Sequence, residues 1–285
     1  MINNLIIGTV QFGLDYGVTN PNGKINDNEL DKIFQFCYEN NILLFDTAQD
    51  YGTSEDIISK YKKIYPNIKI ITKSKFKSNP NSIIQNSLNK FSHINYFLLH
   101  SFNDYNPEII KTLKSFKNIS KIGVSIYNVD EAKVLLKNKD IQIIQLPLNY
   151  IDNQWNDPEF HQLLSQRPDI EIHVRSIFLQ GILLNPIIKY PNNIPKEDFN
   201  LLTQKIETIC KKLNLSKIEL CLAFINSCNW VHKFLIGIDN FNHLLSNFEI
   251  INKNIKLNQE QLKLIQNTIK DINPLITNPS KWTFN

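Results

Sequence analysis

The chain has 285 residues and a net charge of +4, with 42% hydrophobic and 20% charged residues. This apolar content is that of an ordinary globular protein and excludes a disordered chain. The charge is weak and not gathered into blocks, so nothing favours a nucleic-acid partner. Four cysteines, with no pair in C-x-x-C spacing, indicate neither a disulfide framework nor a structural zinc site, and no metal is expected.

No stretch approaches the roughly 20 apolar residues that a transmembrane helix needs. The first residues also lack the basic segment and the small-residue cleavage site of a signal peptide. We therefore expect no membrane partner and a cytoplasmic location.

Short apolar runs alternate with helix-like stretches along the chain. The runs begin at Leu5, Ile42, Ile68, Tyr96, Lys121, Ile141, Ile170 and Lys233. Several are almost continuously apolar, as parallel strands buried on both faces are. The stretches 28–40, 82–91 and 107–116 between them have apolar residues at helical spacing. Eight such units predict an α/β fold, the (β/α)8 TIM barrel, as a single domain over residues 1–285.

A doubly wound sheet is the alternative fold. It normally carries a G-x-G-x-x-G turn after the first strand, and the segment 8–13 lacks that spacing.

Two regions extend the barrel repeat. A long loop over 182–200 leads into helices near 198–213 and 216–228 before the eighth strand, and another helix is expected at 258–271 near the C-terminus.

Side chains that can take part in acid–base chemistry lie at the ends of three neighbouring predicted strands. Asp46, Lys73 and His100 end the second, third and fourth predicted strands, and Tyr51 lies in the loop after Asp46. In a barrel of this kind the active site lies at these strand ends. The Lys73 ammonium would lower the pKa of the Tyr51 phenol, while Asp46 would hold Lys73 charged. With His100 hydrogen-bonding the reacting oxygen, the set suits proton delivery to a carbonyl group that is being reduced.

These four residues also lie in motifs that resemble the aldo-keto reductase family. The matching segments are Phe45–Glu55, Ile71–Lys73, Phe97–His100, Ile122–Ser125, Gln145 with Asn149, and Gln180–Gly181, in family order. The resemblance implies a (β/α)8 barrel that reduces carbonyl compounds with NAD(P)H. Residues 175–181, Arg-Ser-Ile-Phe-Leu-Gln-Gly, resemble a bacterial branch often associated with surface-sugar biosynthesis.

The resemblance also implies a set of cofactor-binding residues. They are Ser125, Gln145, Arg175, Phe178, Leu179, Gly181, Gly237, Asp239, His243 and Asn247. Among them, Ser125 and Gln145 match positions that hydrogen-bond the nicotinamide carboxamide, although Ile126 replaces the usual Asn. Arg175 stands where many relatives place an aromatic ring. It would stack on the nicotinamide, clamp an anionic group, or form a structural ion pair.

The segment 237–247 bears on the choice of cofactor. Relatives that prefer NADP place basic residues there, whereas this chain has Asp239 and His243. We therefore expect NADH to bind at least as well as NADPH, unless another lysine, such as Lys189, supplies the missing charge.

Aromatic residues in the predicted loops are candidates for the substrate pocket. Phe12, Tyr16 and Trp155 would line it, and their faces would suit a sugar ring, although single aromatic residues more often serve packing. The expected function is an NAD(P)-dependent oxidoreductase that interconverts an aldehyde or ketone, including a sugar derivative, and an alcohol, with Tyr51 as general acid and base. The alternatives are a cofactor-sensing or binding barrel with reduced catalysis, and a sugar-nucleotide enzyme that uses its cofactor transiently.

Overall fold

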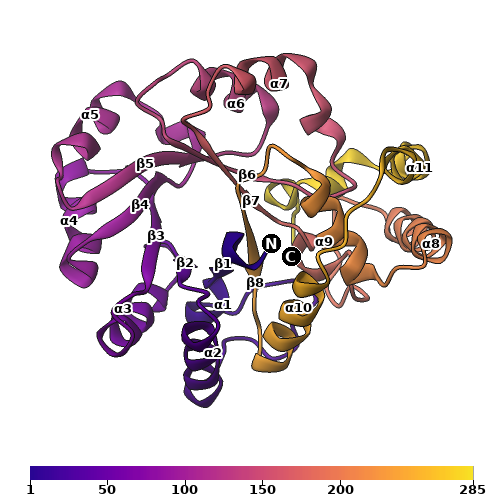
Figure 1. Ribbon diagram of the computed structural model, residues 1–285, viewed down its shortest axis with the longest axis horizontal. Coiled ribbons are helices and arrows are strands. Elements are labelled where there is room, and N and C mark those ends of the chain that lie inside the picture. Colours follow the sequence, from indigo (N-terminus) through magenta and orange to yellow (C-terminus); the bar gives the residue numbers. More distant parts are fainter. Residues whose placement is uncertain (285) are drawn as a thin grey trace.

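The eight apolar runs form the eight strands of a closed barrel (Figure 1). The computed structural model describes residues 1–284. Every strand pairs in parallel with the next, and the last pairs with the first. The strands are β1 (Leu5–Gly8), β2 (Leu44–Asp46), β3 (Lys69–Ser74), β4 (Ile94–Leu99), β5 (Ile119–Ser125), β6 (Ile143–Pro147), β7 (Glu171–Arg175) and β8 (Lys233–Gly237). The predicted (β/α)8 fold in a single domain is confirmed.

An apolar layer fills the middle of the barrel and determines which side chains reach its mouth. The layer consists of Ile6, Leu44, Ile71, Leu98 and Ile143, with Leu235 packed against it. Side chains in a strand alternate between its two faces, so the residue two positions further on points the same way. Asp46, Lys73 and Gln145 each stand two positions after a member of the layer. The barrel register therefore directs all three into the mouth at the C-terminal ends of the strands.

Helices surround the barrel (Figure 1). They are α1 (Val10–Gly13), α2 (Asp27–Glu39), α3 (Ser54–Ile64), α4 (Pro80–Phe91), α5 (Pro107–Ser115), α6 (Val129–Leu136), α7 (Pro158–Ser165), α8 (Lys196–Leu213), α9 (Lys217–Ser227), α10 (Phe241–Lys253) and α11 (Gln259–Ile269). In α2 the Asn26 side chain caps the first turn by accepting a hydrogen bond from the backbone N–H of Glu29, at 3.1 Å. The face of α2 that carries Ile33 and Phe34 is buried.

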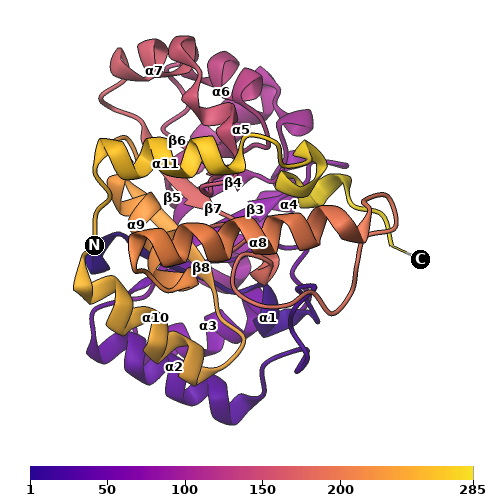
Figure 2. The same cartoon turned by 90° about the vertical axis from the view of Figure 1, so that its right-hand side faces the viewer.

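The three helices that the sequence adds to the repeat are present, within three residues of their predicted limits. α8 and α11 pack side by side outside the barrel (Figure 2). α9 begins with a capping box between Ser216 and Glu219.

Among residues 1–284, none of the helices has the length and apolar character needed to cross a membrane. That part of the chain also holds no group of three or more metal-binding side chains.

Candidate active site

A cavity of about 670 Å³ opens at the C-terminal mouth of the barrel. It begins inside the ring of strands, at Asp46, Tyr51, Lys73 and His100, which we call the inner end. It continues past Gly237 at the end of β8 to α9 and α10, which lie outside the ring (Figure 1). We call this part, lined by Lys217, Asp239, His243, Ser246 and Asn247, the outer end. The cavity is therefore elongated, with one end in the barrel and the other against two helices.

A buried ion pair forms the floor of the inner end. The Lys73 ammonium contacts Oδ1 of Asp46, and both side chains are almost fully buried. Gln145 Nε2 donates a hydrogen bond of 2.7 Å to the other carboxylate oxygen, Oδ2. Burial lowers the pKa of Lys73, and the Asp46 charge opposes that shift. Because both carboxylate oxygens have partners, the pair is held in one arrangement from two sides.

Tyr51 lies above this pair. Its ring centroid is 5.4 Å from Lys73 Nζ and 5.7 Å from the His100 ring, which stands nearly perpendicular at 79°. The expectation that Tyr51 has a lowered pKa is wrong for this structure. Burial raises that pKa, and the Asp46 charge raises it further. The Asp46 carboxylate balances the charge of Lys73, so Tyr51 is a neutral phenol with a proton to donate.

His100 is uncharged in this site. Burial, followed by the Lys73 charge, lowers its pKa to about 3. Its Nδ1 atom is buried and has no hydrogen-bond partner among the described residues. The carboxylate oxygen Oδ2 of Asp50 lies 3.6 Å from that nitrogen. Asp50, the residue directly before Tyr51, was missed in the sequence because nothing in its spacing relates it to His100.

Arg175 lines the cavity close enough to Tyr51 to affect its titration. Its Nη2 donates a 2.9 Å hydrogen bond to the backbone oxygen of Ile126, and its guanidinium lies 4.5 Å from the centroid of the Tyr127 ring. None of the acidic side chains in residues 1–284 forms a salt bridge with it. The structural ion pair is thus not found, which leaves ring stacking and anion binding as its candidate roles.

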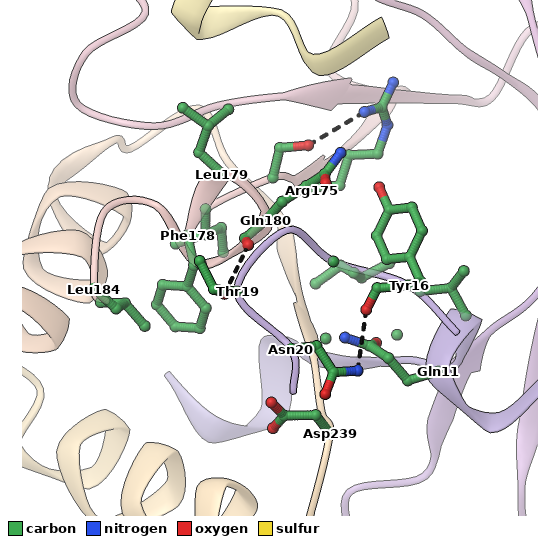
Figure 3. Close-up of a pocket in the computed structure, with 18 of the residues that line it drawn as sticks. Gln11, Tyr16, Thr19, Asn20, Arg175, Phe178, Leu179, Gln180, Leu184 and Asp239 are labelled. Atoms are coloured by element: carbon green, nitrogen blue, oxygen red, sulfur yellow. Dashed lines mark hydrogen bonds between the residues drawn. The ribbon is translucent and has the colours of Figure 1, made fainter. Parts of the chain in front are cut away.

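A tight turn after β7 lines the middle of the cavity. Non-glycine residues with positive φ are uncommon, yet Ser176, Leu179 and Gln180 have φ of 60°, 48° and 54°. Thr19 Oγ1 donates a 3.0 Å hydrogen bond to the backbone oxygen of Gln180 (Figure 3). A Cβ on Gly181 would lie 1.9 Å from that same hydroxyl. Strained backbone of this kind clusters at ligand clamps. Phe178, Leu179 and Gly181, expected to bind the cofactor, all line the cavity here.

Two amide oxygens in the cavity lack partners. Gln145 Oε1 and Gln11 Oε1 are buried and accept no hydrogen bond from the described residues. Gln11, labelled in Figure 3, is close to Gly237 in the chain's fold, because a Cβ on that glycine would be 3.3 Å from the Gln11 oxygen. A buried acceptor left unpaired costs about 1–3 kcal/mol, so each oxygen is a candidate to meet a ligand donor. Gln11, in α1, was missed in the sequence, since a lone glutamine after the first strand carries no motif.

The outer end carries charges of both signs. Asp239 contacts Nδ1 of His243 and raises the pKa of that imidazole. Lys217, in the first turn of α9, lines the same end and was not anticipated. Lys189, the lysine suggested as an alternative, lies over the Phe284 ring at 5.1 Å and does not line the cavity.

Two of the three expected substrate-contacting residues are corrected by the structure. Phe12 is buried edge-on against Phe34, with centroids 5.7 Å apart, and Trp155 packs in the same way against Phe160 at 5.6 Å. Neither lines the cavity, because both rings are used in packing the core. Tyr16 does line it and is 42% exposed. Ser125, Asn247 and the remaining expected cofactor residues also lie in the lining.

The comparisons with known proteins agree with the barrel fold. An aldo-keto reductase from Bacillus halodurans, solved in its holo form, is 19% identical with a TM-score of 0.72, covering 93% of this chain and 91% of that one. A glycerol dehydrogenase from Gluconobacter oxydans is 18% identical with a TM-score of 0.70, covering 99% and 95%. These structures share the fold. No curated protein matches the sequence. The family model described as the Aldo/keto reductase family matches residues 4–270, and the chain therefore belongs to that family.

Proposed function

We propose that the protein is an NAD(P)H-dependent oxidoreductase that interconverts an aldehyde or ketone and the matching alcohol. The observation that carries the proposal is the inner end, where a neutral Tyr51 lies beside the buried pair of Lys73 and Asp46. The proposal extends to a sugar-derived substrate, since one protein of similar fold is a glycerol dehydrogenase, whose named substrate is a polyol.

The cavity lining fits a nicotinamide dinucleotide. Gln145 Oε1, unpaired and buried, would accept a hydrogen bond from the carboxamide, with Ser125 paired beside it in the next strand. The turn at 178–181 would surround the pyrophosphate, and Asn247 would contact the adenine at the outer end. When bound, the reduced nicotinamide would supply a hydride to the substrate carbon, and the oxidised nicotinamide would accept a hydride from the carbon of the alcohol.

Tyr51 has the position and protonation state of the general acid. It donates its proton to the carbonyl oxygen as that oxygen becomes an alcohol, which leaves a phenolate on Tyr51. The Lys73 ammonium, 5.4 Å from the ring centroid, stabilises this phenolate. Asp46 and Gln145 keep Lys73 charged and in place. In the oxidising direction the same phenolate accepts the proton of the alcohol.

Arg175 gives the proposed site a directional preference. Tyr127 covers one face of its guanidinium, which leaves the other face for stacking on the nicotinamide ring. A fixed positive charge there disfavours the cationic oxidised ring and has no such effect on the neutral reduced ring. The arrangement favours carbonyl reduction.

A turnover screen tests the proposal. Purified protein would be assayed with NADH and NADPH against simple aldehydes, ketones and sugar aldehydes, with Tyr51→Phe as the control. We expect turnover that requires Tyr51. Cofactor binding without turnover of any compound would favour the cofactor-sensing barrel. Cofactor that co-purifies tightly, with a sugar nucleotide converted but no net cofactor consumed, would favour the transient-cofactor enzyme.

A further inference from the structure

The segment that carries Tyr51 is held at both of its ends by residues that do not line the cavity. Gln49 precedes Tyr51 by two positions, and its backbone N–H donates a 2.9 Å hydrogen bond to the backbone oxygen of Lys73. Glu55 follows Tyr51 by four positions, in the first turn of α3. The position of the Tyr51 ring relative to Lys73 therefore depends on how Gln49 and Glu55 are fixed.

Glu55 is a buried carboxylate with three partners. Its side chain is only 3% exposed. Its Oε1 atom accepts hydrogen bonds of 2.7 Å from Thr72 Oγ1 and of 2.7 Å from Ser87 Oγ, and its Oε2 atom lies 3.5 Å from Lys90 Nζ. A buried carboxylate is costly unless it is paired and hydrogen-bonded, and here both oxygens have partners. Because Thr72 directly precedes Lys73 in β3, Glu55 connects α3 to the strand that carries the lysine.

The Ser87 hydroxyl joins the two ends of the Tyr51 segment. Ser87 lies in α4, and it is fully buried. Its Oγ atom accepts a 2.7 Å hydrogen bond from Gln49 Nε2 and donates one of 2.7 Å to Glu55 Oε1. A hydroxyl has one proton and two lone pairs, so a single serine can serve both partners at once. Hydrogen bonds that form a chain in a buried setting also strengthen one another.

We propose that Ser87 and Glu55 are positioning residues, which hold Tyr51 in its place beside Lys73 by fixing the two ends of the segment 49–55. Neither residue lines the cavity, so both act through Tyr51 and not on a ligand. A displacement of about 1 Å at a reacting group can cost about 100-fold in rate. The effect on turnover rests on the proposed function, whereas the placement of the Tyr51 ring does not.

Ser87→Ala is the direct test variant. It removes the shared hydroxyl, and alanine is a strong helix former, so α4 should be retained. Gln49 and Glu55 each keep another hydrogen-bond or ion-pair partner. Ser59→Ala is the matched control. Ser59 Oγ donates a 2.8 Å hydrogen bond to the backbone oxygen of Lys90, so it ties the same two helices, α3 and α4, without bonding to Gln49 or Glu55.

The position of the Tyr51 ring can be followed by NMR. The protein would be labelled with ¹³C at Cζ of its ten tyrosines, and Tyr51→Phe identifies the signal. The Lys73 charge and the His100 ring, 5.4 Å and 5.7 Å from the Tyr51 centroid, contribute to its chemical shift, so a displaced ring gives a changed signal. We expect the Tyr51 signal to shift or split in Ser87→Ala and to stay unchanged in Ser59→Ala, although both variants lose a hydrogen bond.

Thr72→Val is a second, independent variant. It removes the other hydroxyl from Glu55 at nearly constant volume, and it should change the same Tyr51 signal. A Tyr51 signal that is identical in wild type, Ser87→Ala and Thr72→Val would overturn the proposal and leave both hydroxyls with a role in stability alone. This measurement needs no substrate, cofactor or activity, so it decides the proposal even where the proposed function fails.

Kinetics then tests the consequence for turnover. In Ser87→Ala, kcat should fall roughly 10- to 100-fold while the Kd for NADH stays within about twofold, because the residues that line the cavity are unchanged. Ser59→Ala should keep kcat within about twofold of the wild type. A wild-type kcat in Ser87→Ala would overturn the positioning role. Absence of turnover by the wild type in the whole screen would instead count against the proposed function.

Discussion

The two ends of the cavity are built in different ways. The inner end is made from residues at the ends of strands, and its central pair, Asp46 and Lys73, is almost fully buried. The outer end is made from a loop and two helix starts, and the His243 side chain there is 55% exposed. A charge is therefore fixed and poorly screened at the inner end, whereas water and salt weaken charges at the outer end. We expect changes at the inner end to affect the chemical step and changes at the outer end to affect cofactor affinity.

The largest expected effect is at Tyr51. Tyr51→Phe removes the proton donor and keeps the ring, so kcat should fall by about 10²–10⁴-fold while the Kd for NADH is largely kept. Lys73→Met should also lower kcat, because the charge that stabilises the phenolate is lost. Steady-state kinetics and a binding titration on the same preparations separate the two quantities. An activity of Tyr51→Phe within about threefold of wild type would remove Tyr51 from the proposed role.

Cofactor choice tests the outer end. The 2′-phosphate of NADPH would meet Asp239 there, and like charge together with the missing ion pair should cost about 2 kcal/mol, or roughly 30-fold in affinity. NADH should bind at least as well as NADPH, and Asp239→Ser should strengthen NADPH binding several-fold without changing kcat. Dissociation constants would be measured at one ionic strength. Wild-type NADPH binding more than tenfold tighter than NADH would assign the phosphate to a basic partner, for which Lys217 is the lining residue to test.

The pKa of His100 predicts a pH-dependent stability at the inner end. Its folded value of about 3 lies below the ordinary value of 6.5, so the unfolded chain binds the extra proton more readily. Stability is therefore lost as the pH falls below 6.5 towards 3, and His100 should contribute a loss of about 2 kcal/mol between pH 7 and pH 5. Urea unfolding of wild type and His100→Gln at both pH values checks this. Equal losses in the two proteins would mean that His100 titrates normally.

Arg175 has the smallest expected effect of the four. Arg175→Gln removes the positive charge from the proposed nicotinamide site, so binding of the oxidised cofactor should improve relative to the reduced one by a factor of about five. Paired titrations with the two redox forms give this ratio for each protein. An unchanged ratio would move Arg175 away from the nicotinamide ring, to substrate binding or to a structural role.

The sequence predicts the inner end better than the outer end for a physical reason. The active site of a barrel lies at the C-terminal ends of its strands, so Asp46 and Lys73, which end predicted strands, could be assigned to the mouth before any coordinates. No comparable rule predicts whether a side chain in a loop points into the cavity or into the core. Phe12 and Trp155 therefore looked like pocket residues but lie in the core, and Lys217 was missed although it lines the cavity.

The protonation state of Tyr51 also could not be predicted from the sequence. Lys73 does lie near the Tyr51 ring, as expected. The direction of the Tyr51 pKa shift, however, depends on how deeply Tyr51 is buried and on the Asp46 carboxylate, which balances the charge of Lys73. Both are properties of packing in three dimensions. The contact between Asp50 and His100 could not be predicted from the sequence either, because it joins segments that follow two different strands.

The central claim is that one dinucleotide spans the cavity with its nicotinamide at the inner end. A competition titration tests it most directly, with NADH and with ADP-ribose, which lacks the nicotinamide, on wild type and Gln145→Leu. We predict saturable binding of NADH, displacement by ADP-ribose, and a roughly five- to tenfold loss of NADH affinity in Gln145→Leu with ADP-ribose binding unchanged, since one hydrogen bond is worth about 1 kcal/mol. Absence of saturable NADH binding, or an equal loss for both ligands, would contradict the account.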